Sequence, residues 1–447
     1  MKIEINEQFK KALDLMENTN KNIFITGVAG VGKSVLLSYF QAITSKRLAV
    51  LAPTGVAALN VKGETIHSFF CFRPGITKEK VWELKVSNKR RILYRNLQMI
   101  IIDEVSMVRA DLFDCVDAFL KIYGPAPGKP FGGVQAVFIG DLHQLPPVVT
   151  GKENFIFKRF YDSPYFFSAK SFNKLNVELV ELTKVYRQKD PVFIDLLNAI
   201  RNNCLTTDQL ILLNTRVGAE LPSDKSGYSV YLTTTNKKAS KVNEESLRSM
   251  ETKIHTFKAK IAGNIDRSFY PTDEELQIGA GAQIMLLNND SQDRWVNGSI
   301  GRVIKIYTFD EDWTEANIDV QLDNGKVVTV VPHSWEIFSY FYNKERNIID
   351  AERMGSFRQF PLKLAFSCTV HKSQGKTFPL VKLDLSQGIF AHGQAYVALS
   401  RCVSLEGLSL EQPFDQKHIL TDRVVVEFMK WLRGKEEANV QEIRKNI

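Results

Sequence analysis

The stretch that most constrains the fold is the run Gly27-Val28-Ala29-Gly30-Val31-Gly32-Lys33-Ser34, which directly follows the apolar segment Ile23-Phe24-Ile25. The run matches the pattern G-x-x-x-x-G-K-[ST], and it lies where that pattern requires it, after a buried strand. Apolar residues recur at helical spacing from Lys33 to Phe40, so a helix is predicted directly after the loop. The alternative is a chance strand–turn–helix in a glycine-rich stretch, which would have to match the pattern in its strand, its loop spacing and its helix. The sequence therefore predicts a phosphate-binding loop in an α/β sheet.

The glycines of this loop allow the backbone to wrap closely around a polyphosphate, with several N–H groups pointing at it. Lys33 would reach the β and γ phosphates, and Ser34 would ligate Mg²⁺. We expect the loop to bind ATP, with Mg²⁺ as the cofactor. The predicted nucleotide-binding residues of the loop are Gly27, Ala29, Gly30, Val31, Gly32, Lys33 and Ser34.

Two carboxylates, Asp103 and Glu104, follow the apolar run Met99–Ile102. They emerge at the carboxyl end of a predicted buried strand, and open α/β sheets bind their ligands at that edge. Asp103 fits an outer-sphere Mg²⁺ ligand, and Glu104 fits the base that orients the attacking water. Paired acids also occur at ordinary loop starts, but the nearby phosphate loop favours catalysis. Gln144, in the loop after the predicted strand 134–139, is placed to contact the γ phosphate or the water.

Polar loops follow other predicted strands, and each allows two interpretations. The loop Pro53-Thr54-Gly55 is able to hold a phosphate of a second ligand, and it fits an ordinary strand-to-helix turn equally well. His67, between aromatic residues, fits either a core histidine or a stacking and phosphate contact. Hydroxyls and an amide at 233–236, after the predicted strand 230–232, suit contact with a phosphate backbone.

The second half of the chain shows a further α/β pattern without a phosphate loop of its own. Between residues 279 and 360 short strands alternate with turns, and Asp323-Asn324-Gly325 is a strong hairpin signal. We interpret this segment as a small β-barrel-like insertion. Arg187 and Arg401 are the candidates for supplying positive charge to the γ phosphate from this second lobe, as arginine fingers do. An arginine after an apolar helix is otherwise usually a surface residue.

Composition narrows the class of protein. The 447 residues carry a formal net charge of +8, which favours an acidic partner, and nucleic acid is the common one. The five cysteines are scattered without ligand spacing and are interpreted as free thiols in a reducing compartment. No apolar run approaches the ~18–20 residues that span a bilayer, and the N-terminus lacks a signal or transit pattern. We expect a soluble cytoplasmic protein that does not act at a membrane.

These blocks, in this order, resemble the superfamily-one helicases of the 5′-to-3′ branch, most closely the petite-integration-frequency (Pif) family of DNA helicases, with RecD-like relatives. The resemblance extends from residue 8 to about residue 402. The segments that carry it are GVAGVGKS (27–34), APTGVAALN (52–60), TIHSFF (65–70), IIDEVSM (101–107), FGGVQ (131–135), GDLHQLPPV (140–148), VYRQ (185–188), TVHKSQGKTF (369–378) and AYVALSRC (395–402).

The resemblance implies an α/β fold of two RecA-like P-loop lobes, with a small wedge insertion in the first and a small Src-homology-type barrel in the second. It implies an adenine contact from Gln8, a nucleotide contact from Gly375, and arginine fingers at Arg187 and Arg401. It also implies that single-stranded DNA crosses both lobes. The implied DNA contacts are Pro53, Thr54, Gly55, His67, Ser68, Phe69, Thr234, Asn236, Thr369, His371 and Lys372.

The corresponding domain prediction has five parts. Residues 1–180 form the first lobe, with the wedge at about 61–97, and 181–278 begin the second lobe. Residues 279–360 form the barrel, 361–433 complete the second lobe, and 434–447 form a charged tail. The chain starts almost at Gln8, from which we expect a bacterial or viral core enzyme.

The resulting hypothesis is an ATP-dependent 5′-to-3′ DNA helicase, monomeric when free, acting in replication, repair, recombination and genome maintenance, including telomeres. Its expected partners are single-stranded DNA and tailed or forked duplexes, with G-quadruplexes and RNA–DNA hybrids as further substrates. Three alternatives stay open: a translocase without strong unwinding, a nucleotide-gated single-stranded DNA clamp, and a small-molecule kinase. The kinase gives no reason for a second lobe with basic loops at its strand ends.

Overall fold

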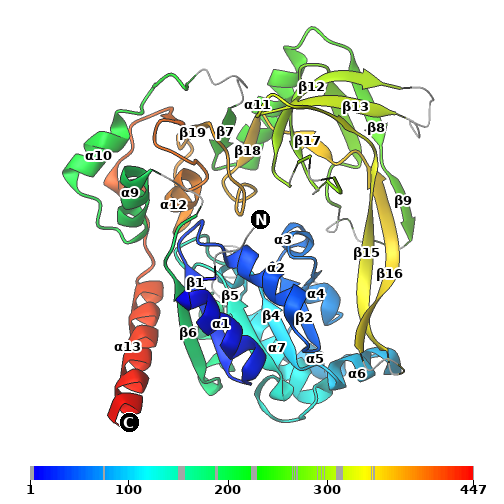
Figure 1. Ribbon diagram of the computed structural model, residues 1–447, viewed down its shortest axis with the longest axis vertical. Helices are drawn as coiled ribbons and strands as arrows, with labels where there is room; N and C mark the ends of the chain where they lie inside the picture. The colour runs from blue at the N-terminus through cyan, green and yellow to red at the C-terminus, as the bar shows by residue number, and fades with distance from the viewer. Residues whose placement is uncertain are drawn as a thin grey trace. The chain divides into compact units, whose positions relative to one another are not determined.

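The computed structural model describes residues 5–73, 76–149, 157–186, 190–222, 229–263, 265, 267, 270–288, 290–292, 294–295, 297–308, 316–343, 345 and 348–445. The chain divides into two compact units (Figure 1). Unit 1 comprises Met1–Arg187, Phe338–Glu352 and Asp422–Ile447, and unit 2 comprises Gln188–Ile337 and Arg353–Thr421. Within the described residues, no helix is long and apolar enough to cross a bilayer.

Unit 1 is built on a six-stranded sheet of order β3-β2-β4-β5-β1-β6, in which every neighbouring pair is parallel. Both faces are covered, so the strands are nearly continuous apolar runs. Its strands are β1 (Asn22–Gly27), β2 (Leu48–Ala52), β3 (Glu64–Thr65), β4 (Met99–Ile102), β5 (Gln135–Ile139) and β6 (Val177–Leu182). Its helices are α1 (Glu7–Asn18), α2 (Lys33–Ile43), α3 (Gly55–Asn60), α4 (Ile66–Phe69), α5 (Lys78–Glu83), α6 (Asn88–Arg95), α7 (Ala110–Tyr123) and α13 (Arg423–Lys445).

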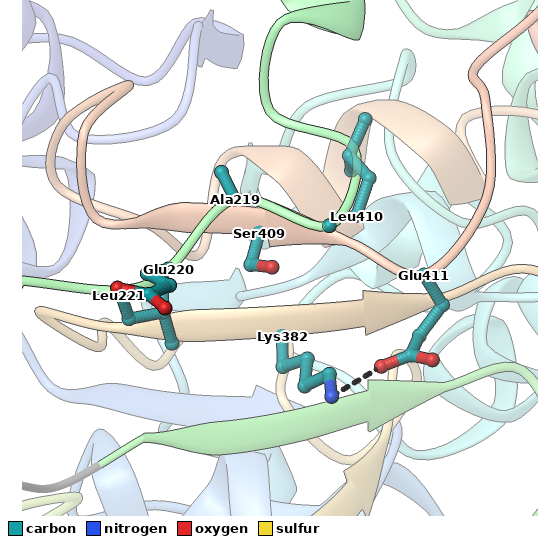
Figure 2. Close-up of a pocket in the computed structure, with 8 residues that line it drawn as sticks. Ala219, Glu220, Leu221, Lys382, Ser409, Leu410 and Glu411 are labelled. Carbon is teal, nitrogen blue, oxygen red and sulfur yellow. Dashed lines mark ion pairs between the residues drawn. The ribbon is translucent and has the colours of Figure 1, made fainter.

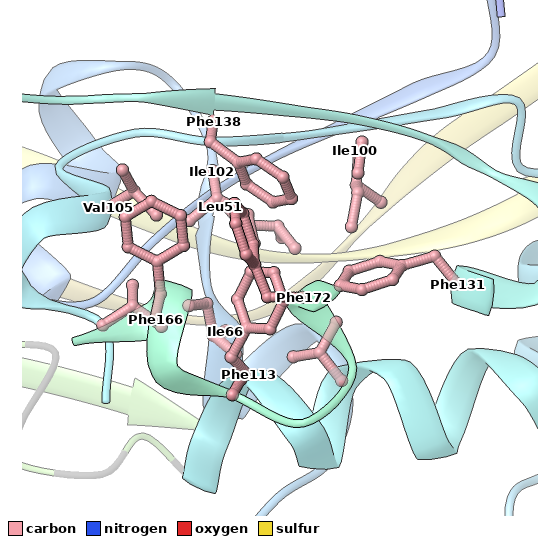
Figure 3. Packing of buried hydrophobic residues seen from close by; sticks show 14 of the residues in the cluster. Leu51, Ile66, Ile100, Ile102, Val105, Phe113, Phe131, Phe138, Phe166 and Phe172 are labelled. Carbon is pink, nitrogen blue, oxygen red and sulfur yellow. The ribbon is translucent and has the colours of Figure 1, made fainter. Parts of the chain in front are cut away.

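Two hydrophobic clusters lie on opposite faces of this sheet. Alternation along β1 shows the division, because Phe24 belongs to one cluster while Ile23 and Ile25 belong to the other. The larger cluster is dominated by aromatic rings from α7, β5 and the segment before β6 (Figure 3). Phe166 and Phe172, from the segment before β6, are buried in this cluster.

Unit 2 has a four-stranded parallel sheet of order β18-β7-β19-β20. Its strands are β7 (Val230–Thr233), β18 (Ser367–Thr369), β19 (Val381–Asp384) and β20 (Leu408–Leu410). Its helices are α9 (Pro191–Arg201), α10 (Thr207–Asn214), α11 (Asn236–Arg248) and α12 (Gln394–Leu399). Because neighbouring strands run in the same direction, the loops after β18, β7 and β19 leave from one edge.

A five-stranded antiparallel sheet, of order β14-β13-β12-β11-β17, lies within unit 2. Its predicted hairpin is confirmed, since Gly325 has φ +81° and Leu322 N–H donates to the Lys326 carbonyl at 2.8 Å. The strands are β11 (Gln283–Leu286), β12 (Ile300–Tyr307), β13 (Asn317–Leu322), β14 (Val327–Val330) and β17 (Leu362–Leu364). Two smaller sheets comprise β8 (Ile254–Lys258) with β10 (Glu275–Gly279), and β9 (Lys260–Gly263) with β15 (His333–Asn343) and β16 (Ile348–Gln359).

The division into units differs from the predicted domains in three places. Phe338–Glu352, predicted as part of the barrel, belongs to unit 1. Unit 1 extends to residue 187 rather than 180, because β6 pairs with β1 along its whole length. Helix α13 begins at Arg423, inside the segment predicted to complete the second lobe, and it belongs to unit 1. The helix continues to Lys445, through most of the segment predicted as a charged tail. The Phe428 ring stacks on Phe167 at 4.0 Å, and Arg433 forms a bidentate pair with Glu181.

Candidate functional site

The phosphate loop connects β1 to α2, and its backbone conformation requires glycine at three positions. A Cβ on Gly27 would lie 2.3 Å from the Leu182 carbonyl oxygen on β6, so no other residue fits there. Gly30 and Gly32 have φ values of +86° and +85°, which residues with a side chain rarely adopt. The loop thus ends in the first turn of α2, whose unpaired N–H groups favour an anion.

Lys33 begins α2 and folds back over the loop. Its Nζ donates to the carbonyl oxygens of Gly27 at 2.8 Å and Val28 at 3.1 Å. Ser34 is the next residue and is exposed at the same helix start. The amine is therefore held at the loop mouth by hydrogen bonds that a phosphate oxygen can replace.

The carboxylates Asp103 and Glu104 follow β4 at the carboxyl edge of the same sheet. Burial and the charge of Glu104 raise the pKa of Asp103 to about 7, and the positive charge of Lys33 opposes the shift. Glu104 has φ +48° and ψ +42°, a left-handed conformation that costs a non-glycine residue about 1–2 kcal/mol. Strain of this kind is often retained at functional positions. The Asp103 carboxylate and the Ser34 hydroxyl are oxygen ligands of the kind that Mg²⁺ prefers, so the donor set fits this ion.

Gln144 is buried and is held by a neighbour that the sequence argument did not single out. Asp141, fully buried after β5, accepts hydrogen bonds from His143 N at 3.1 Å and from Gln144 Nε2 at 3.4 Å. Asp141 lies two residues after the buried strand β5, much as Asp103 directly follows β4, and that signal was present in the sequence. The structure thus adds Asp141 as a positioning residue for Gln144.

Gln8 lies on α1, beside the chain segment that leaves β6. Its Nε2 donates to Thr183 Oγ1 at 3.1 Å. In the same segment Tyr186 is exposed, and its N–H donates to the Gly30 carbonyl at 2.9 Å. Tyr186 therefore contacts the phosphate loop, and Gln8 is joined through Thr183 to the same chain segment. Of these three residues, only Gln8 was predicted as a nucleotide contact. The predicted finger Arg187 is outside the described residues.

The predicted nucleic-acid contacts of unit 1 divide into accessible and buried positions. Thr54 is exposed and caps α3, since its Oγ1 accepts from Ala57 N at 3.2 Å, with Pro53 and Gly55 partly exposed on either side. His67 and Ser68 are partly exposed on α4, and burial lowers the pKa of His67.

Phe69 does not fit its predicted role as a DNA contact. Its side chain is only 1% exposed and packs edge-to-face on Phe70 and Tyr94 in the core of unit 1. Its carbonyl oxygen accepts from Tyr94 Oη at 2.5 Å and from Arg90 at 3.0 Å. No face of the ring is therefore open to a nucleobase, and Phe69 is a core residue.

In unit 2 the predicted contacts lie in loops that leave adjacent strands of one parallel sheet. Asn236 is exposed at the start of α11, whereas Thr234 is buried. Thr369 Oγ1 accepts from Lys372 N at 3.3 Å, which shapes the loop that presents an exposed Lys372. His371 is partly exposed in this loop, and Gly375 is exposed with φ +77°. These positions keep their predicted contacts as hypotheses.

Arg401 is not a free finger in unit 2. It is 1% exposed, and its guanidinium donates to the carbonyls of Val397 at 2.8 Å, Lys376 at 3.0 Å and Ser373 at 3.4 Å. A fourth bond reaches Ser400 Oγ at 2.8 Å. Arg401 therefore braces the loop that contains His371 and Lys372, which spacing in the sequence does not reveal.

A separate cavity of about 390 Å³ in unit 2 contains none of the predicted site residues (Figure 2). It lies beside the edge strand β20, where Lys382 pairs with Glu411 at 2.6 Å. Its apolar lining includes Leu221 and Leu410. We assign no catalytic role to it.

Comparison with known proteins agrees with this architecture. A family model described as PIF1-like helicase matches residues 3–209. A Bdellovibrio bacteriovorus protein named ATP-dependent DNA helicase Pif1 is 33% identical over 443 residues, covering 97% of this chain and 93% of that protein. The chain belongs to the PIF1-like helicase family. It also matches the human and Emericella nidulans proteins named ATP-dependent DNA helicase PIF1, at 33% and 32% identity, but it spans only 62% of the length of each.

Solved Pif1 structures share the fold over nearly the whole chain. The crystal structure of Bacteroides sp Pif1 in complex with ADP-AlF4 has a TM-score of 0.88 at 35% identity and covers 97% of this chain and 98% of that one. The crystal structure of Pif1 helicase from Candida albicans has a TM-score of 0.75 at 28% identity, with 96% and 100% covered. The predicted family and the α/β fold with RecA-like lobes are thus confirmed.

Proposed function

We propose that this chain is an ATP-dependent DNA helicase that moves 5′ to 3′ on single-stranded DNA and unwinds tailed and forked duplexes. The observation that carries the proposal is the placement of Lys33 and the pair Asp103–Glu104 at one edge of the unit 1 sheet. That arrangement is the hydrolytic half of a nucleotide-driven motor. The relative named ATP-dependent DNA helicase Pif1, which matches nearly the whole chain, supports DNA as the nucleic acid on which the motor acts.

In this proposal Lys33 exchanges its bonds to the loop carbonyls for bonds to the β and γ phosphates of ATP. Ser34 and Asp103 would hold Mg²⁺, which neutralises phosphate charge when it is bound. Glu104 accepts the proton of the attacking water, and Gln144, held by Asp141, orients that water. Gln8 contacts the adenine, and Arg187 and Arg401 are the candidates for charge stabilisation from the second lobe.

Movement along DNA requires grip on the sugar-phosphate backbone, which carries no sequence information. Pro53, Thr54, Gly55, His67 and Ser68 in unit 1 are the proposed contacts, and unit 2 contributes further contacts from its strand-end loops. Related proteins provide precedent: one structure shows Bacteroides Pif1 bound to ssDNA, and another concerns forked dsDNA and two coordinating Pif1 helicases. We propose that the protein is a monomer in the free state. The number of copies that assemble on one DNA molecule is to be measured separately.

Finer parts of the proposal concern substrates and domains. The helices α5 and α6 would form the wedge, and the antiparallel sheet of unit 2 would form the barrel. We extend the substrates to G-quadruplexes and RNA–DNA hybrids, and the process to replication, repair, recombination and telomere maintenance. These follow from the Pif resemblance and are separate from the core activity.

The test combines hydrolysis with strand separation. We expect ATPase activity to rise on addition of single-stranded oligonucleotide, and duplexes with a 5′ tail to be unwound in preference to those with a 3′ tail. Lys33→Ala should abolish hydrolysis and leave oligonucleotide binding intact. An ATPase rate indifferent to DNA would refute the motor, and movement without strand separation would indicate the translocase instead. DNA binding that follows nucleotide occupancy without turnover would indicate the clamp.

A further inference from the structure

An exposed aromatic ring lies beside the predicted DNA-contact loop of unit 2. Phe390 is 61% exposed, in the loop between β19 and α12. Its ring is parallel to the ring of His371, with an interplanar angle of 10° and ring centres 6.1 Å apart. The two residues come from loops that follow β18 and β19, which both flank β7. The fold therefore brings two flat rings together at one sheet edge.

The backbone around Phe390 is fixed by hydrogen bonds to a buried glutamine side chain. The N–H groups of Phe390 and Ala391 both donate to Gln394 Oε1, at 3.1 and 3.4 Å, and Gln394 is fully buried at the start of α12. A left-handed Gly393 precedes that helix. The exposed ring is thus presented by a pinned loop, which reduces the entropy lost when a ligand stacks on it.

Charge and chemistry around these rings point to an unpaired nucleobase as the ligand. Burial lowers the pKa of His371, so the imidazole is neutral near pH 7 and offers a flat surface without a charge. Lys372 directly follows His371 in the chain and is exposed. A base stacked on the rings would therefore have its phosphate near a positive charge. Alternating aromatic platforms and cations are the usual means of holding single strands without sequence preference.

We propose that Phe390 and His371 form a stacking platform that holds one base of the translocated single strand, while Lys372 contacts the adjoining phosphate. This inference rests on the proposed function and adds a base contact to a grip otherwise made through phosphates. Such a contact is sequence-tolerant because every base has a π-face. It would be worth about 5- to 150-fold in affinity, the range for one base stacked on an aromatic side chain.

The experiment is an abasic scan. A short oligonucleotide is prepared with one abasic unit at each position in turn, and its affinity is measured for wild type and for Phe390→Ala. Wild type should show a position at which base removal weakens binding by about 5-fold or more. Phe390→Ala should weaken the intact oligonucleotide similarly and erase the penalty at that position alone. Phe390→Tyr should retain the wild-type profile.

Two controls separate stacking from other roles. Phe160→Ala removes a comparably exposed aromatic, 58% exposed, in unit 1, and should leave the profile unchanged. Lys372→Ala should reduce the slope of log affinity against log salt by about 0.7, whereas Phe390→Ala should leave this slope unchanged. An identical abasic profile in wild type and Phe390→Ala would overturn the platform. A wild-type protein that fails to bind single strands at all would instead overturn the proposed function.

Discussion

Replacing Arg401 with alanine tests whether this residue is primarily a brace or a finger. The guanidinium makes at least four hydrogen bonds within unit 2. After its removal the Val397 carbonyl still accepts from Ser400 Oγ, and the Ser373 carbonyl still accepts from Lys376 N–H. The Lys376 carbonyl loses its donor, and an orphaned buried acceptor costs about 1–3 kcal/mol. Adding the weakened bonds and the emptied volume, we expect about 3 kcal/mol of destabilisation.

The assay is thermal unfolding alongside ATP hydrolysis and oligonucleotide binding. Arg401→Ala should lower the melting temperature of the unit 2 transition by several degrees, on the order of ΔΔG divided by the unfolding entropy. It should also weaken single-strand binding, because the braced loop presents His371 and Lys372. A variant with wild-type melting and wild-type DNA affinity, but with hydrolysis lowered by about 10³ or more, would refute the brace. That result would identify a pure finger.

Three further predictions concern single positions. Gly27→Ala should abolish nucleotide binding or prevent folding, because its Cβ would meet the Leu182 carbonyl at 2.3 Å, and nucleotide titration with a melting curve distinguishes these outcomes. Phe69→Ala should cost about 3–5 kcal/mol of stability, measured by denaturant unfolding, whereas Phe69→Leu should retain DNA affinity if the ring only packs. Lys376→Met should stabilise the protein at pH 7: burial and the charge of Lys363 lower the pKa of Lys376 to about 7, so the unfolded chain binds more protons. Wild-type stability should rise by about 2 kcal/mol between pH 7 and 9, and the variant should lose most of this rise in melting curves.

Strand positions were predictable because a parallel sheet buried on both faces needs continuous apolar runs, and such runs are visible along a sequence. The run Met99–Ile102 is entirely buried as β4, and the acids that follow it lie at the strand end. Asp141 follows the buried strand β5 in a similar way, so its position was predictable on the same ground. The long strands β15 and β16 were not predicted, because their residues mix charged, aromatic and small side chains without a clear period of two.

Side-chain environments were less predictable than strand ends. The segment His67-Ser68-Phe69-Phe70 has the same sequence whether the Phe69 ring faces a ligand or the core. The α4 helix turns Phe69 inward and leaves His67 partly exposed, and only the packing of Tyr94 from α6 decides between these positions. Likewise, the partners of Arg401 are backbone carbonyls from residues 373 and 376, which no side-chain pattern identifies.

The bracing of residues 373–376 gives a physical route by which nucleotide and DNA would influence each other. The guanidinium of Arg401 cannot serve both its loop carbonyls and a γ phosphate with the same N–H groups. If Arg401 acts as a finger, its recruitment to ATP must therefore release the Ser373 and Lys376 carbonyls, and the loop with His371 and Lys372 becomes less constrained. Linkage then requires DNA on that loop to change the affinity for ATP by the same factor by which ATP changes the affinity for DNA. Arg401→Lys, which keeps the charge but cannot bridge these carbonyls, should reduce that mutual factor, measured by titrating each ligand with the other present. An unchanged factor would mean that coupling runs through other residues.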